Sequence, residues 1–65
     1  MTKQEFARAK LKAYTDGRRA VFEDRKPVLP EGDFNMHQLE VLHNALQEGL
    51  LIGLRDLEAA KRSIL

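Results

Sequence analysis

The second half of the chain, residues 35–65, restricts the fold most, because it reads as one long amphipathic helix that contains a Gly-x-x-x-Gly step. Apolar or small residues recur there at intervals of three and four, which places them along one face of a helix with 3.6 residues per turn. We call this face the leucine seam, and its members are Leu39, Leu42, Leu46, Gly49, Leu50, Gly53, Leu57, Ala60 and Ile64. A helix with such a face requires a neighbour that covers it.

The residues just before the seam carry a helix start signal. Asn35 is a favourable N-cap residue, and Gln38 follows three positions later, where its side chain reaches back to the N–H of the cap. Phe34 and Leu39 occupy the two positions of a hydrophobic staple. Together these signals predict a helix over residues 36–64.

Gly49 and Gly53 interrupt the leucines inside this helix. Each costs up to about 1 kcal/mol relative to Ala in a helix interior, so another interaction must offset them. We expect close approach by another helix, which the missing Cβ atoms permit, and we expect that helix to be the same segment of a second copy. The alternative is a kink or break at the step. A membrane helix is excluded, because the uncharged run between Glu48 and Arg55 is far shorter than the roughly 20 residues that a bilayer requires.

A first helix is predicted over residues 3–25. Thr2 and Glu5 have the spacing of a capping box at its start, and Pro27 disfavours helical angles in the residue before it. The dipeptide Asp16-Gly17 is a turn signal, but the apolar periodicity continues in phase on both sides of it. The alternative is a break at this dipeptide, which would leave a short third helix over residues 18–25.

The predicted connection, residues 26–34, contains the sequence Pro-Val-Leu-Pro followed by Glu-Gly-Asp. A Pro-x-x-Pro segment is one feature of ligands for SH3 domains, but no clear basic anchor flanks it here. We instead expect Val28 and Leu29 to fold back over the open end of a helix bundle. The connection has a length suited to an antiparallel helical hairpin.

The chain has 65 residues and no cysteine, so neither a disulfide nor a thiolate metal site can stabilise it. Chains of this size commonly gain stability by oligomerising. We therefore predict a single all-α domain, residues 1–65, folded as an antiparallel hairpin that dimerises into a four-helix bundle. The leucine seam is the predicted dimer interface, and a higher oligomer is the alternative. No signal-peptide pattern opens the chain, and we expect a cytoplasmic protein with no membrane contact.

Residues suited to catalysis or metal binding are few and poorly spaced. Ser63 is the only serine, and no histidine lies at helical spacing to activate it. His37 and His43 are six residues apart, about 120 degrees around a helix, whereas a two-histidine metal face needs a spacing of four. We therefore expect no enzymatic activity, no cofactor and no metal.

Charge is distributed unevenly along the chain, so its two halves should attract each other. Residues 1–26 carry eight basic and four acidic side chains, a net +4, whereas residues 27–65 carry three basic and six acidic ones, a net −3. A basic ridge on the outer side of the first helix is a candidate contact for nucleic acid, formed by Arg8, Lys12, Arg18 and Arg19. We expect this face to be solvated, with Arg8 paired to Glu5 and Arg19 to Glu23, and nucleic-acid contact is the alternative.

The first five residues, Met1-Thr2-Lys3-Gln4-Glu5, resemble the start of the Rop family, whose members are dimeric four-helix bundles that bind paired RNA stem-loops. In an ungapped comparison, the core positions of that family coincide with residues that cannot form a buried seam, namely Glu5, Arg8, Lys12, Thr15 and Arg19. The resemblance therefore covers five residues and a general architecture, and RNA binding is not carried over from it.

Apolar residues outside the leucine seam indicate a protein partner. Val41, Leu51 and Ile52 form a second, weaker stripe on the same helix and are a candidate partner surface. We therefore predict a non-catalytic homodimer that acts as a protein-binding adaptor or regulator, similar in style to accessory proteins of phages and plasmids. Nucleic-acid binding through the first helix is the alternative.

Overall fold

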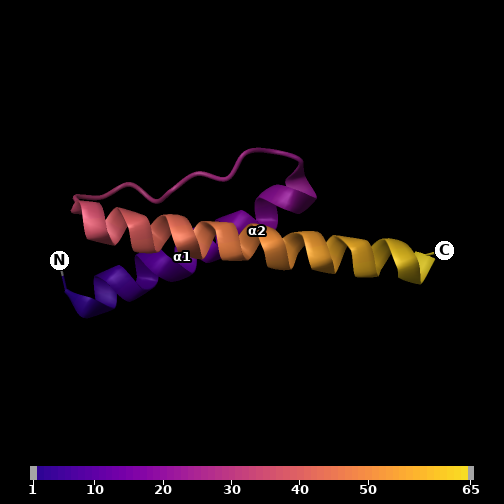
Figure 1. Ribbon diagram of the computed structural model, residues 1–65, viewed down its shortest axis with the longest axis horizontal. Coiled ribbons are helices and arrows are strands. Elements are labelled where there is room, and N and C mark those ends of the chain that lie inside the picture. Colours follow the sequence, from indigo (N-terminus) through magenta and orange to yellow (C-terminus); the bar gives the residue numbers. More distant parts are fainter. Residues whose placement is uncertain (1, 65) are drawn as a thin grey trace.

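The chain forms two helices joined by a long connection. The computed structural model describes residues 2–64, the side chain of Ile64 excepted. Helix α1 spans Lys3–Glu23 and helix α2 spans Met36–Ile64, and no strand occurs among these described residues. The helices cross, and residues 24–35 return beside them from the end of α1 to the start of α2 (Figure 1). The all-helical prediction is confirmed.

The two helices run in the same direction, so the predicted antiparallel orientation is wrong. Gly17 lies against Leu46 and Leu50, whereas Gly53, further along α2, lies against Arg18 and Val21, further along α1. The connection makes this orientation possible. Its residues 24–35 reach up to about 40 Å when extended, and α1 with its 21 residues is about 32 Å long. The connection is therefore long enough to run back along the whole length of α1, so α2 can start beside the beginning of α1.

Both helices begin at the predicted capping boxes. The Glu5 N–H donates to the Thr2 hydroxyl at 3.1 Å, and the Glu5 carboxylate accepts from the Thr2 N–H. At α2, the Gln38 N–H donates to the Asn35 side-chain oxygen at 2.8 Å, and the Asn35 N–H donates to the Gln38 side chain at 3.0 Å. These pairs satisfy N–H groups that have no partner inside the helix, so each helix start is determined locally.

Helix α1 ends two residues before the predicted boundary, at Glu23. The next residue, Asp24, adopts the left-handed conformation with φ of 53°, which terminates the helix. The N–H groups of Asp24 and Arg25 both donate to the carbonyl of Ala20, so the last turn closes on itself. Asp tolerates this conformation better than most residues, because its short side chain is compatible with a positive φ.

Glycine residues form the helix crossing. Helix α1 continues unbroken through Gly17, and α2 continues through Gly49 and Gly53, so the alternatives of a break at either place are wrong. All three glycines are buried. A Cβ atom on Gly49 would collide with the carbonyl oxygen of Tyr14 and would lie 3.2 Å from the backbone nitrogen of Arg18. The predicted close approach is therefore confirmed, but the approaching helix is α1 of the same chain.

The core is small and lies near the first half of α2. Its buried members are Ala13, Leu42 and Leu46, and Ala20 is also buried further along α1. Two residues of the returning connection, Leu29 and Phe34, pack against this core from the side. The connection is thus a third layer of the fold. Leu29 covers the core as predicted, whereas the neighbouring Val28 is 67% exposed.

One carboxylate holds the start of the connection against α1. Asp16 accepts two hydrogen bonds from the Arg25 guanidinium, at 2.8 and 3.2 Å, and a third from the Val28 N–H at 2.8 Å. The bonds from Arg25 and Val28 lower the pKa of the Asp16 carboxyl below its ordinary value. Asp16 is the acidic half of the dipeptide that suggested a turn, and its role is to fasten the returning chain.

The Asp16→Asn variant is expected to be less stable by about 1 kcal/mol, because Asn cannot accept the charge-assisted bonds of Arg25. Folding lowers the pKa of Asp16, so its contribution is fully present above the ordinary carboxyl pKa and is lost as the pH falls through the folded-state value. Urea unfolding followed by circular dichroism, at neutral pH and at decreasing pH, measures both effects. The difference from the parent should shrink in acid. Glu31→Gln, which neutralises another carboxylate in the connection, is the matched control. Equal stability of Asp16→Asn and Glu31→Gln at neutral pH would contradict this role of Asp16.

Candidate interaction surfaces

The leucine seam is divided between the inside and the outside of the chain. Leu42, Leu46, Gly49 and Gly53 are buried by α1 and by the connection, so they are not available to a second copy. The prediction that the two glycines form the centre of a dimer contact is wrong for this reason. Other seam members are less covered: Leu50 and Leu57 are half-buried, Leu39 and Ala60 are exposed, and the side chain of Ile64 lies outside the described residues.

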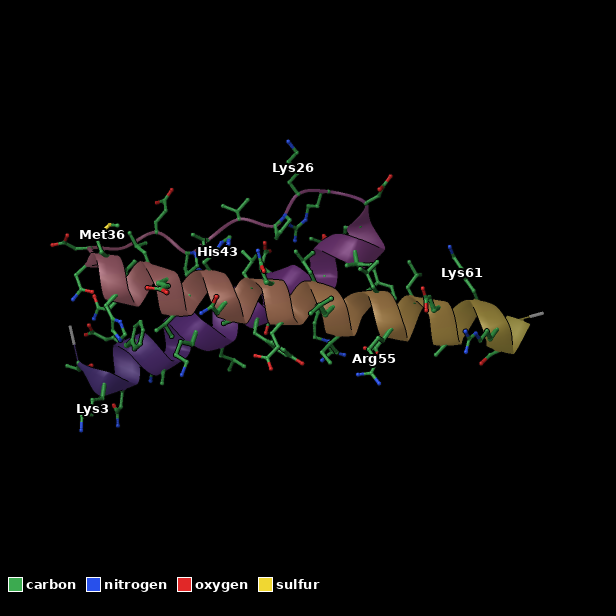
Figure 2. All side chains as sticks on the ribbon, in the orientation of Figure 1. Lys3, Lys26, Met36, His43, Arg55 and Lys61 are labelled. Carbon is green, nitrogen blue, oxygen red and sulfur yellow. The ribbon has the colours of Figure 1, made fainter. Side chains whose placement is uncertain are left out.

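The end of α2 extends beyond every other part of the fold. Figure 1 shows its last turns continuing past α1 and past the connection, with no other segment beside them. Arg55 and Lys61 project from this end on opposite sides (Figure 2). No described helix contains an apolar stretch of the length needed to cross a bilayer. The exposed end is therefore an amphipathic helix whose apolar side has no cover within the chain.

An apolar groove lies where α1 ends against α2. Its volume is about 590 Å³. We call it the distal groove, and it is lined by Ala20, Val21, Asp24, Arg25, Lys26, Leu50, Leu54 and Leu57. Leu54 is 49% exposed. Three leucines and a valine thus form an open apolar surface that continues onto the protruding end of α2.

The predicted partner surface does not form one patch. Leu51 is 62% exposed on the outer side of α2, whereas Val41 and Ile52 are half-buried. Adjacent residues of a helix point about 100 degrees apart, so Leu51 and Ile52 face different directions. The structure leaves Leu51 as an isolated exposed leucine, which is common on soluble proteins and does not by itself indicate a partner.

The structure separates the four residues of the basic ridge. Arg18 forms an ion pair with Asp56 of α2 at 2.9 Å and lies over the ring of Tyr14. In contrast, Arg8, Lys12 and Arg19 form no ion pair within the described residues. The expected pairs with Glu5 and Glu23 are absent there, because Glu5 caps its own helix and Glu23 binds Arg25. Three cations of the ridge therefore have no ion-pair partner among the described residues.

A second groove lies between α1 and the returning connection. Its volume is about 530 Å³. We call it the basic groove, and it is lined by Arg8, Leu11, Lys12, Thr15, Asp16, Arg19, Val28, Leu29, Pro30 and Glu31. Leu11 and Val28 are 65% and 67% exposed. The sequence did not predict this groove, because the path of the connection was not predicted. The available signal was Leu11, an apolar residue that is exposed on the same side of α1 as the cations.

The described residues contain no group of three or more His, Cys, Asp or Glu side chains arranged to hold a metal ion. His43 lies 3.0 Å from the side-chain nitrogen of Gln47 and forms a hydrogen bond with it on the surface of α2. This hydrogen bond joins two residues one helical turn apart.

Comparisons of the chain with protein-family models, with curated proteins and with solved structures find no significant match. Among the described residues, the accessible features of the surface are the two grooves, the exposed apolar side chains and three cations that form no ion pair.

Proposed function

We propose that the protein is a non-catalytic binding module that acts as a homodimer and docks another protein. The observation that supports the dimer most is the leucine seam, which continues past the end of α1 on the protruding half of α2. The buried hydrophobic core of the described residues consists of only two alanines and two leucines. A chain of this size gains stability when a second copy covers further apolar surface.

The proposed dimer uses the distal groove. In a contact with two-fold symmetry, Leu54 and Leu57 of each copy enter the groove of the other, beside its Val21 and Leu50. One self-complementary patch then covers both protruding ends. This arrangement still brings four helices together, but the glycine crossing stays inside each chain. Contact at the distal groove therefore replaces the bundle predicted from the sequence.

The dimer predicts a mass of twice 7.4 kDa in size-exclusion chromatography with light scattering, at micromolar concentrations. Leu54→Glu should weaken the dimer by at least about 100-fold, because the change occurs twice in a symmetric contact and each buried leucine contributes about 1.5 to 3 kcal/mol. Leu51→Glu is the matched control, since Leu51 is equally exposed or more so and lies outside the groove. A wild-type chain that stays monomeric at these concentrations would contradict the proposed dimer. A mass larger than that of a dimer would favour a higher oligomer.

A second candidate function is nucleic-acid binding through α1. The observation in its favour is the charge of Arg8, Lys12 and Arg19, which form no ion pair with a carboxylate of the described residues. Arg18 leaves the predicted set because Asp56 binds it. Against this function, none of the side chains that line the basic groove is aromatic and able to stack on a base. The experiment that closes the next subsection includes a DNA probe for this reason.

A further inference from the structure

The basic groove has two walls that are held in place by different means. One wall is the outer side of α1, a continuous helix. The other wall is the connection, which Asp16 fastens through the Val28 N–H at 2.8 Å and which packs into the core through Leu29. Pro27 and Pro30 further restrict the backbone on either side of these residues. The groove is therefore already formed in the free chain, so a ligand does not have to order the connection when it binds.

The side chains of the basic groove combine apolar and positive surface. Leu11 on α1 and Val28 on the connection are large, exposed and apolar, and Leu29 and Pro30 extend this apolar lining. Positive charge is provided by Arg8, Lys12 and Arg19, which lie on α1 over about 16 Å along the helix axis.

The negative charge in the same groove is smaller. Two carboxylates line it, but Asp16 is already bound by Arg25. Glu31 is thus the one carboxylate in the lining that forms no ion pair within the described residues. With three cations against two carboxylates, the lining of the groove carries a net charge of +1.

We propose that the basic groove binds an acidic segment of a partner protein that also carries a large apolar side chain. The apolar side chain lies between Leu11 and Val28, and carboxylates of the segment pair with Arg8, Lys12 and Arg19. This inference rests on the proposed protein-binding function and names its site and the chemistry of its partner. Burial of the exposed leucine and valine favours binding, and the cations select negatively charged segments over neutral or basic ones.

The composition of the groove favours a peptide over a nucleic acid. Phosphate groups would use the cations but would leave Leu11 and Val28 without a complementary surface. Bases bind through aromatic stacking or through hydrogen bonds to their edges, and the lining contains no aromatic side chain. An acidic, apolar peptide satisfies both halves of the groove at once.

Fluorescence anisotropy with the full chain tests the proposal. The first probe is a labelled peptide in which Glu and Asp alternate with Leu and Phe, the second has Ala in place of Leu and Phe, and the third is a labelled DNA duplex. The first probe should bind most tightly, and added salt should weaken it. Leu11→Ser should weaken this binding by at least tenfold, and so should Arg8→Glu combined with Arg19→Glu.

Matched controls separate the groove from general effects of charge and apolar exposure. Leu51→Ser removes an equally exposed leucine from α2, and Lys3→Glu with Lys10→Glu reverses two charges of α1 outside the groove. Figure 2 shows Lys3 pointing away from the connection. These variants should bind the first probe like the parent chain. Circular dichroism of every variant confirms that the helices are intact.

Three results would overturn the proposal. One is equal binding of the acidic probes with and without Leu and Phe, together with no effect of Leu11→Ser. Another is tighter binding of DNA than of either peptide, which would assign the cations to nucleic acid. The third is a drop in the light-scattering mass of the groove variants, which would make a second copy the occupant. The dimer and the groove are tested separately. An intact dimer that does not bind the peptide would contradict only the proposed role of the groove. A monomeric chain that still binds the peptide would contradict only the proposed dimer.

Discussion

Gly49→Ala should lower the free energy of unfolding by at least about 2 kcal/mol, although the same change inside an ordinary helix raises it by up to about 1 kcal/mol. The reason is the backbone of α1. The added Cβ would collide with the carbonyl oxygen of Tyr14 and would lie 3.2 Å from the nitrogen of Arg18. Backbone atoms cannot move aside by rotating a side chain, so the two helices must separate at their crossing.

Urea unfolding of the variants, followed by circular dichroism, measures this effect. Asn44→Ala is the control, because Asn44 is exposed on the same helix and its replacement should be neutral or slightly stabilising. Gly53→Ala should destabilise less than Gly49→Ala, since its Cβ would lie 2.9 Å from the Arg18 carbonyl oxygen, 3.0 Å from a Val21 methyl group and 3.2 Å from the Arg18 Cα, without the collision that Gly49 would have. A Gly49→Ala chain that is more stable than the parent would show that the crossing is not this close in solution.

Leu42→Ala should destabilise the chain by about 2 to 5 kcal/mol, which is the usual range for truncating a leucine in a packed core. Leu42 is 0% exposed and is the one large side chain among the described residues that is fully buried. Its neighbours Ala13 and Leu46 belong to a core with few other members, so little material is available to fill the cavity. For a domain with a total stability of about 5 kcal/mol, a loss of this size leaves much of the chain unfolded.

The control for Leu42→Ala is Leu51→Ala, which removes the same atoms from a leucine that is 62% exposed on the same helix. Because Leu51 is already in contact with water, its truncation should change stability by less than about 0.5 kcal/mol. Thermal and urea unfolding of both variants distinguish the two positions. Similar losses for Leu42→Ala and Leu51→Ala would mean that the core is not centred on Leu42.

Helix boundaries were predictable because their causes are local. Each capping box satisfies backbone groups only a few residues away, in one case through Thr2 and Glu5 and in the other through Asn35 and Gln38. Both partners of each interaction therefore lie within four consecutive residues of the sequence. The predicted end of α1 lies two residues too late, because the prediction rested on Pro27, whereas the left-handed conformation of Asp24 ends the helix before it. Local chemistry thus gave the correct elements with a small error at one boundary.

The candidate sites were less predictable, because they depend on which segments meet. The basic groove exists only because residues 24–35 return along α1, whereas the sequence predicted an antiparallel helical hairpin. The basic ridge was found from its spacing, but only contact with Asp56 shows that Arg18 is not part of it. The exposed Leu51 was identified correctly, whereas the covering of Ile52 required the packed structure.

Two helices, their capping residues and a close contact at the glycine step follow from the sequence alone, because periodicity and capping act over a few residues. The contact of Gly49 with α1 of the same chain, the parallel orientation of the helices and the two open grooves became visible only in the folded chain. A seam of small and apolar residues specifies close packing, but it does not specify which helix packs against it. The partner is selected by contacts distant in sequence, here the bonds of Asp16 to Arg25 and Val28 and the burial of Leu29.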